Sequence, residues 1–443
     1  MEFSGETTAT SRRGVLKGAL ALGGASALSA CLDVVGDEPI PQGGDQSLPR
    51  QQFAWNDSLE HDDHGNIVLP EHHLFLYLTY AGENADAEHG HPTDTDRDTL
   101  NAALDTIERA YEWSNRGVVF DLAYSPAYFA RFDESLPDDI DLPEPRPLSS
   151  LEDPTLDEQD ALLHLASDRA DALLAIEESL FAERDTDGPA GTLNDVDVDS
   201  RLSEVFEIDD RRTGFIGSGL PADKQDDVSG IPDNGPVPDE SPLFMGFKAG
   251  FIGNQAPEEY VAFDSGPFEG GTTKQVAAIR QSLDKWYDEN DHDKMVSLMF
   301  SPLLAESGAV EGVGENLGDH NGVDTEIYEQ IRETAERFGR VGHTEKVARA
   351  NHDSDGNTRL LRRHVESTDN DRASLHFATL QREISDFVDV REAMNGDDLT
   401  DGTAVQRRED NNGILRYLFT ENRGNFLVPP RSLRAFPTPT GDE

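Results

Sequence analysis

Apolar residues change their spacing along the first half of this chain in a fixed order, and that order limits the folds open to it. His72 to Tyr80, Gly117 to Tyr124 and Ala161 to Ser167 alternate their side chains with period two, which predicts β-strands. Asp96 to Trp113 and Arg169 to Ala182 repeat apolar residues every three or four positions, which predicts helices. We therefore expect a β-α-β-β-α-β order, the split ferredoxin-like pattern.

The second half follows the same logic with shorter elements. We expect strands at 260–263, 272–279, 359–365 and 375–381, and helices at 281–288, 384–394 and 413–420. A further helix is expected to carry Ile327, Ile331 and Phe338 on one face. Together the halves predict an α+β fold, with an N-terminal half over 61–242 and a C-terminal half over 243–443. The acidic, loop-rich stretch 185–242 is expected to form an insertion over the pocket.

Acidic residues dominate the charge. The chain has 88 Asp and Glu against 37 Lys and Arg, which gives a formal net charge of −51 at pH 7. Because apolar positions still recur periodically, this charge indicates the coat of a folded protein and not disorder. A carboxylate-rich surface suits molar salt, where the Debye length falls to about 3 Å, so we expect a halophilic, archaeal origin. Without a basic stripe, a nucleic-acid partner is not expected.

The N-terminus has the pattern of an export signal. Ser11-Arg-Arg-Gly-Val-Leu-Lys17 precedes a weakly apolar run that is shorter than the ~20 residues of a spanning helix, which is typical of a twin-arginine signal. Leu28-Ser-Ala-Cys31 is typical of a lipobox, so we expect a signal over 1–31 and a cell-surface lipoprotein anchored at Cys31. Cys31 is the only cysteine, which excludes disulfides in the mature domain. Residues 32–60 are expected to form a flexible tether.

The richest group of potentially reactive residues lies between Gly342 and Gln381. Gly342-His-Thr-Glu-Lys-Val-Ala-Arg-Ala-Asn is followed by Arg359-Leu-Leu-Arg-Arg-His and then by Ser374-Leu-His-Phe-Ala-Thr-Leu-Gln. In an alternating strand, Arg362 and His364 share one face and Arg363 takes the other. This order resembles the C-terminal half of the dye-decolorizing (Dyp-type) haem peroxidases, in particular their exported, deferrochelatase-like branch.

Other segments are similar to the same family in collinear order, over roughly residues 70 to 432. They are Leu162-Leu-His-Leu-Ala-Ser-Asp, Met245-Gly-Phe-Lys-Ala-Gly, Gly270-Gly-Thr-Thr with Arg280 and Trp286, Gly413-Ile-Leu-Arg-Tyr-Leu, and Asn425-Phe-Leu-Val-Pro-Pro. The shared order implies two ferredoxin-like halves that form a dimeric α+β barrel.

The resemblance also implies a cofactor and a site. The cofactor is haem b, with His343 as the axial ligand of its iron and with Phe247, Arg280 and Phe377 as haem contacts. Arg362 is the implied catalytic residue, facing bound peroxide. Phe247 is spaced with Phe244 and Phe251 by three and four residues. These three side chains could line a porphyrin pocket or could equally well be part of the hydrophobic core. Lys346, His352, His364 or no residue at all remain open as alternatives for the ligand.

One position departs from the family pattern. The family's Gly-x-x-Asp-Gly element supplies an Asp as acid–base partner of peroxide, and Ala249 occupies that place here. His364, which shares the strand face of Arg362, could take over the proton transfer.

Three functions compete. The first is a haem-dependent peroxidase that reduces hydrogen peroxide with electrons from an unidentified reductant. The second is an exported haem-binding or iron-acquisition lipoprotein with weak or no turnover, held to the membrane only by its lipid. The third is a haem-free structural protein. An oligomer remains open for all of them.

Overall fold

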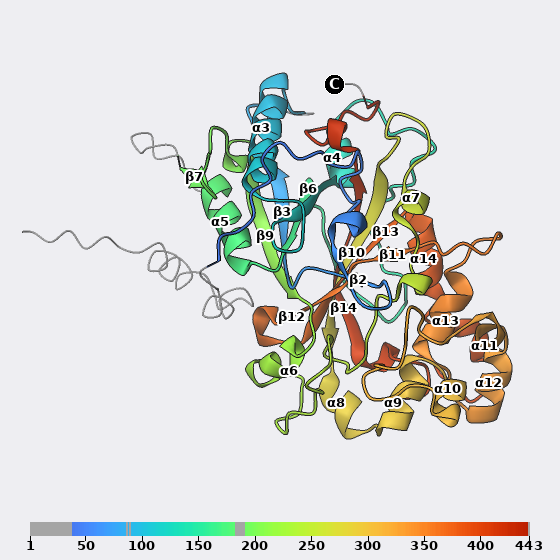
Figure 1. Ribbon diagram of the computed structural model, residues 1–443. Helices are drawn as coiled ribbons and strands as arrows, with labels where there is room; N and C mark the ends of the chain where they lie inside the picture. Colours follow the sequence, from blue (N-terminus) through green and yellow to red (C-terminus); the bar gives the residue numbers. More distant parts are fainter. Residues whose placement is uncertain (1–37, 86, 88–89, 182–190, 442–443) are drawn as a thin grey trace, which may run out of the picture.

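The computed structural model describes residues 38–85, 87, 90–181 and 191–441. The expected export signal and Cys31 lie outside the described residues. The described part is built around a large, mainly antiparallel sheet with helices packed on its outside (Figure 1), and the expected α+β class is confirmed.

Four strands of the N-terminal half pair in the spatial order β9–β3–β6–β4. Two helices connect them and pack on one face of the sheet. The bounds of these elements are β3 (His72–Tyr80), α3 (Asp94–Ala110), β4 (Val119–Tyr124), β6 (Ala161–Ser167), α5 (Ala170–Phe181) and β9 (Phe206–Phe215). This is the order expected for a ferredoxin-like half.

The C-terminal half repeats the order as β12–β13–β10–β14, with short β11 also paired to β13. Its strands are β10 (Thr272–Gln281), β11 (Leu361–Arg362), β12 (Val365–Ser367), β13 (Ser374–Gln381) and β14 (Leu418–Val428). Its helices are α8 (Leu283–Asp288), α9 (His292–Met299), α10 (Pro302–Ser307), α11 (Thr325–Glu329), α12 (Ile331–Phe338), α13 (His343–Ala350) and α14 (Ile384–Ala393). Most of these helices lie between β10 and β11 in sequence and gather at one side of the sheet (Figure 1).

Within the main run of eight long and short strands, two single residue pairs join the halves. Glu366 of β12 pairs with Phe215 of β9, and Leu427 of β14 pairs with Tyr124 of β4. Because β10 pairs with both β13 and β14, these contacts close eight strands into a ring. Short elements surround the ring: β1 (Glu60–His61), β2 (Ile67–Val68), α4 (Pro126–Phe129), β5 (Thr155–Leu156), β7 (Thr192–Leu193), β8 (Val196–Asp197), α6 (Leu220–Lys224) and α7 (Glu258–Val261).

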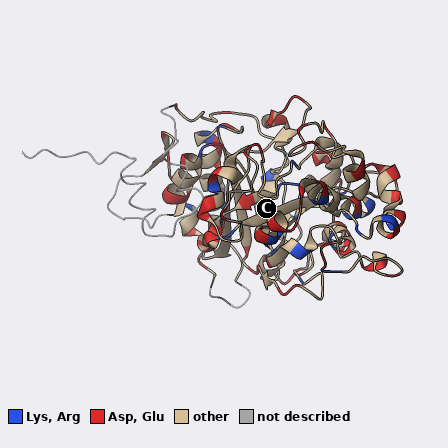
Figure 2. Ribbon diagram, turned by 90° about the horizontal axis from the view of Figure 1, so that it is seen from below, with Lys and Arg blue, Asp and Glu red and all other residues tan. Residues whose placement is uncertain are grey.

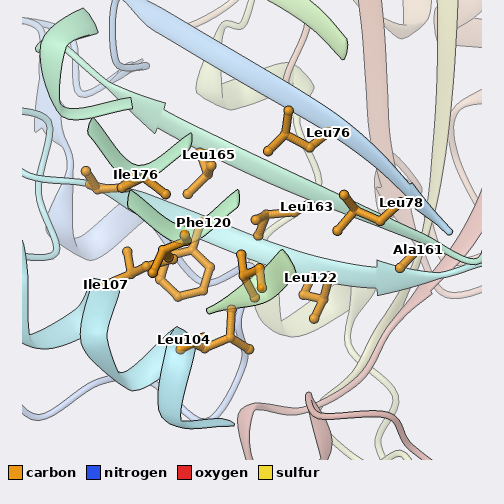
Figure 3. Close-up of a cluster of buried hydrophobic side chains, with 14 of the residues drawn as sticks. Leu76, Leu78, Leu104, Ile107, Phe120, Leu122, Ala161, Leu163, Leu165 and Ile176 are labelled. Atoms are coloured by element: carbon orange, nitrogen blue, oxygen red, sulfur yellow. The ribbon is translucent and has the colours of Figure 1, made fainter. Parts of the chain in front are cut away.

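The outer face of the N-terminal strands makes one core with its helices. Leu76, Phe120 and Leu163 from the strands meet Leu104 of α3 and Ile176 of α5 (Figure 3). Burying each such side chain contributes about 1.5–3 kcal/mol relative to leaving it in water. The inner faces make a second core inside the ring, which holds Phe75, Tyr77, Val276, Leu380 and Phe426.

A polar group crosses this second core between the halves. Lys274 of β10 donates hydrogen bonds to both carboxylate oxygens of Asp121, at 2.6 and 2.9 Å, and lies 3.1 Å from a ring nitrogen of His164. His164 in turn lies 2.9 Å from His73. All four side chains are buried. Because removing one partner of a buried pair typically costs about 3–5 kcal/mol, this group ties the halves together specifically.

Several sequence expectations need correction. The stretch 185–242 is not only loop, since it contains β9, the fourth strand of the N-terminal half. The strand expected at 260–263 is instead the single helical turn α7, which follows Pro257. The helix expected at 413–420 is a short 3-10 turn at Leu415–Tyr417, after which β14 begins. The strand expected at 359–365 is divided into β11 and β12.

The tether expectation is also wrong in its described part. Phe53 and Trp55 are fully buried, and Gln51 forms a β-bridge with Pro430. The Trp55 indole donates a hydrogen bond to the carbonyl of Gln52 and lies under the guanidinium of Arg363. Residues 51–55, within the expected tether, are therefore part of the fold.

In the described part of the chain, Asp and Glu are spread over the outer helices and loops, with Lys and Arg interspersed among them (Figure 2). None of the helices in the described ranges is long and apolar enough to cross a membrane.

Candidate functional site

A cavity that opens to solvent lies between helix α13, the strands β11 to β13 and the loop before residue 255. Helix α13 begins at a tightly packed point. A Cβ atom on Gly342 would lie 1.9 Å from the carbonyl oxygen of Phe300, so only glycine fits there. Glu345 caps the helix by accepting a hydrogen bond from the Gly342 N–H at 2.9 Å, and Ser301 donates to the same carboxylate. His343 is thereby fixed in the first turn and lines the cavity.

The imidazole of His343 is neutral at physiological pH. Burial, and then the charges of Lys346 and Arg362, lower its pKa to about 3. Its Nδ1 is buried and has no hydrogen-bond partner among the described residues. A neutral imidazole at a cavity wall has the chemistry of a metal ligand.

Lys346, the alternative ligand, points away from the cavity. Its Nζ donates to the carbonyl oxygens of Met394 and Asn412, at 2.8 and 2.9 Å, and to Oδ1 of Asn412 at 2.8 Å. Three oxygens thus occupy its three donors, and the residue is absent from the cavity wall. His352 also lines the cavity, and its Nδ1 lies 2.7 Å from the carbonyl oxygen of Ala348. A donor bond from Nδ1 leaves Nε2 as the ligand nitrogen, so His352 stays an alternative.

The strand wall follows the alternation of β-structure. Arg362, His364 and Glu366 line the cavity at every second position. Leu361 and Val365 point to the inner core, while Arg363 pairs with Glu258 at 2.7 Å.

Arg362 is a cation without a counter-ion. Its guanidinium donates only to neutral oxygens, Oε1 of Gln255 at 3.3 Å and the carbonyl of Asn254 at 3.2 Å. It takes part in no ion pair within the described part of the chain, although the chain has an excess of carboxylates. Burial lowers its pKa to about 10, so it stays charged at neutral pH. Such a group is suited to stabilise a negative charge that arrives with a ligand.

The loop from Gly246 to Gly250 forms the rim beside Arg362. Both glycines have positive φ angles, +85° and +80°, which side chains rarely adopt. Phe247 and Ala249 line the cavity from this loop, with Phe251 just beyond it.

Glu366 contributes the only carboxylate among the lining residues. One oxygen accepts a hydrogen bond from the Phe244 N–H at 2.9 Å, and the other accepts one from the Gln281 amide. No cation contacts it among the described residues, and burial raises its pKa to about 8. A carboxyl group held neutral near pH 7 can serve as a proton donor or acceptor.

Comparison with known proteins assigns the chain to a family. Residues 70–430 match the model of DUF7405, a family of unknown function. The chain belongs to DUF7405. No curated protein matches its sequence.

Solved structures resemble this DUF7405 chain in fold. The encapsulated DyP-type peroxidase from Mycobacterium smegmatis superposes with a TM-score of 0.53 at 14% identity, over 84% of this chain and 97% of that one. A DypB variant from Rhodococcus jostii in complex with heme gives a TM-score of 0.50 at 14% identity, over 83% and 96%. The DUF7405 chain therefore has the fold of the Dyp-type peroxidases.

The residues that sequence reasoning selected fall in two places. The first cavity of the DUF7405 chain is lined by four of them: His343, Arg362, Phe247 and Phe377. Arg280 does not: it lies near the end of β10, where it pairs with Glu421 at 3.2 Å and stacks on Phe419. Phe244 is packed against Phe215 in the core, and only its N–H reaches a cavity residue.

Glu366 and Gln281 were missed. The signal for Glu366 was present, because continuing the alternation from Arg362 and His364 by two residues reaches it. Nothing in the sequence indicated Gln281, because it comes close to Glu366 only through the pairing of β10 with β13.

Proposed function

We propose that the cavity binds a b-type haem and that the protein reduces hydrogen peroxide with electrons from a separate reductant. The observation that carries this proposal is the placement of neutral His343 and unpaired Arg362 on different walls of the same cavity. The fold supports it, because its relatives of similar fold include a DyP-type peroxidase and a heme complex.

The lining fits such a group. Phe247, Phe251 and Phe377 offer apolar surface for a flat macrocycle. Lys248 and Arg362 are cations that form no ion pair among the described residues, and the two carboxylates of a haem would supply partners. The neutral imidazole of His343 at the cavity wall fits an iron ligand.

When bound, haem would supply the iron centre at which peroxide is reduced. The chain's residues have separate tasks around it. His343 presents a neutral nitrogen, and the fixed start of α13 holds its orientation. Arg362 stabilises negative charge on the departing oxygen. Ala249 cannot move a proton, so we propose slow turnover unless His364 replaces that function.

Ala249 also favours a second candidate. A haem-binding lipoprotein that captures haem or iron would need the cavity and His343 but no acid–base residue beside Arg362. In either case we propose export by the twin-arginine route and anchoring at Cys31, on the basis of the N-terminal pattern.

Titration of the full chain with hemin in molar salt tests the proposal. We expect one equivalent to bind with a Soret band that differs from free hemin, followed by a spectral change when hydrogen peroxide is added. Binding without a peroxide reaction would select the haem carrier. The absence of binding would reject both haem functions.

A further inference from the structure

A second cavity adjoins the first. It also opens to solvent and lies between the segment 56–69, the loop 249–259 and strand β11. Ala249, Gly250, Arg362 and His364 line both cavities. The unpaired guanidinium of Arg362 therefore lies where the two meet.

The shared wall is thin at Ala249 and Gly250. Ala249 contributes one methyl group and Gly250 no side chain at all. A Cβ atom placed on Gly250 would meet only the Gln255 amide, at 3.9 Å. Little side-chain volume therefore separates a molecule in one cavity from a molecule in the other.

The second cavity has the composition of a binding site for an organic molecule. Ile216, Ile252 and Leu361 provide apolar wall. Arg363 and His364 belong to the same wall and are 3% and 7% exposed. The Arg362 guanidinium, which also lines this cavity, offers N–H donors to an oxygen atom. An occupant with an oxygen atom and an apolar body would match this wall.

We propose that this protein accepts organic hydroperoxides, with the organic substituent in the second cavity and the O–O group beside Arg362 in the first. This proposal rests on the proposed function and names its substrate class. The O–O bond breaks; one oxygen leaves on the substituent as an alcohol and the other leaves as water. The two electrons and two protons come from two molecules of a phenol-class donor, each of which loses one electron and one proton.

The test compares peroxides of different size on the full chain loaded with hemin in molar salt. Hydrogen peroxide, tert-butyl hydroperoxide and cumene hydroperoxide are each mixed with the parent protein and three variants. Ala249→Leu fills the shared wall, and Ile252→Trp fills the second cavity from its rim, where Ile252 is 40% exposed. Ala404→Leu is the control, because Ala404 is exposed and lines neither cavity.

We expect both filling variants to slow the reaction with cumene hydroperoxide about tenfold, which corresponds to ~1.4 kcal/mol in the barrier. The reaction of Ile252→Trp with hydrogen peroxide should stay near that of the parent, because Ile252 lines only the second cavity, and Ala404→Leu should change neither reaction. Equal slowing of large and small peroxides in Ile252→Trp would overturn the proposal. So would a parent protein that reacts with hydrogen peroxide but with neither organic peroxide, an outcome that leaves the proposed function intact.

A binding measurement without haem tests the second cavity independently of the proposed peroxidase function. Cumyl alcohol, the product from cumene hydroperoxide, is titrated into the haem-free protein by calorimetry. We expect binding to the parent and to Ala404→Leu, and weaker binding to Ile252→Trp. If no peroxide reacts, the proposed function fails, and this titration alone decides whether the second cavity takes an organic molecule; no heat, or equal heat for Ile252→Trp, rejects it.

Discussion

His343 and Arg362 face one cavity from different elements, and the charge of Arg362 helps to keep His343 neutral. His343 lies in the first turn of α13, whereas Arg362 ends β11 nineteen residues later. After burial and the charge of Lys346, Arg362 is the next cause of the low pKa of the imidazole. The same cation that would act on peroxide thus also favours the ligand form of the histidine.

Replacing His343 with Ala should remove the axial ligand. We expect weaker hemin binding and a shifted Soret band, measured by absorption titration in molar salt. His64→Ala is the matched control, because His64 is exposed and lines neither cavity. An unchanged Soret position and affinity in His343→Ala would remove His343 from the site.

Placing a carboxylate at Ala249 should speed the reaction with hydrogen peroxide. General acid–base catalysis typically contributes about 10²- to 10⁴-fold, and Ala249 lies at the rim beside Arg362. Stopped-flow mixing of hemin-loaded Ala249→Asp with peroxide measures the effect, with Ala249→Asn as an uncharged control of similar size. A rate equal to that of the parent would show that the loop does not face the reacting peroxide.

Replacing Arg362 or its neighbour Arg363 with Leu should affect different properties of the protein. Arg362→Leu leaves no carboxylate unpaired, so we expect a native melting temperature and a peroxide reaction slowed by about 10²-fold, the usual loss for one stabilising donor. Arg363→Leu leaves buried Glu258 without its cation, and should lower the free energy of unfolding by about 3–5 kcal/mol. Thermal melts and stopped-flow rates on both variants separate the roles. The reverse pattern would contradict the assignment of Arg362 to the cavity.

Glu366 should make stability depend on pH. Its pKa rises from 4.5 in the unfolded chain to about 8 in the fold, so the native state holds the extra proton between these values. The resulting stabilisation is complete below pH 4.5 and is lost as the pH rises through about 8, with a slope of up to ~1.4 kcal/mol per pH unit.

Urea unfolding of Glu366→Gln across this window checks the slope. The variant has no titrating carboxyl at the position, so its stability should fall less steeply with pH than that of the parent. Glu329→Gln, at an exposed position, should follow the parent. Parallel curves for Glu366→Gln and the parent would show that the carboxyl is already ionised.

Stability should also depend on salt. The 88 acidic side chains outnumber the 37 basic ones, and the excess carboxylates repel one another when screening is withdrawn. Transfer from molar to millimolar salt should cost several kcal/mol, enough to lower the melting temperature by about 10 °C in a chain of this size. Calorimetric melts over that range measure it, and a constant melting temperature would end the halophile interpretation.

Local patterns in the sequence were sufficient where one face of an element is buried. β3 and β6 occupy the expected residues because their apolar side chains pack against helices or the inner core. The order of His343, Arg362 and Phe377 along the chain also led to residues that share the main cavity.

The sequence periodicity led to wrong predictions where tertiary contacts determine the secondary structure. β9 contains Asp210, Arg211 and Arg212 and so lacks an apolar period. Its charges are neutralised by distant residues, with Arg212 paired to Asp157 and Arg211 to Glu177. In the same way, β14 follows a helix-like stretch but takes its form from pairing along the whole of β10. Arg280 was assigned to the site by resemblance alone, and its guanidinium stacks on Phe419 of that neighbouring strand.

The closure of the eight strands into a ring affects how separate molecules of this protein associate. Every strand in the ring has a hydrogen-bonded neighbour on both sides, whereas an open sheet ends in strands whose free N–H and C=O groups recruit other chains into aggregates. Concentrated salt screens the repulsion that would otherwise hold acidic molecules apart. The backbone pairing of the ring thus removes this template from its eight strands at any ionic strength, whereas repulsion between carboxylates weakens as salt is added.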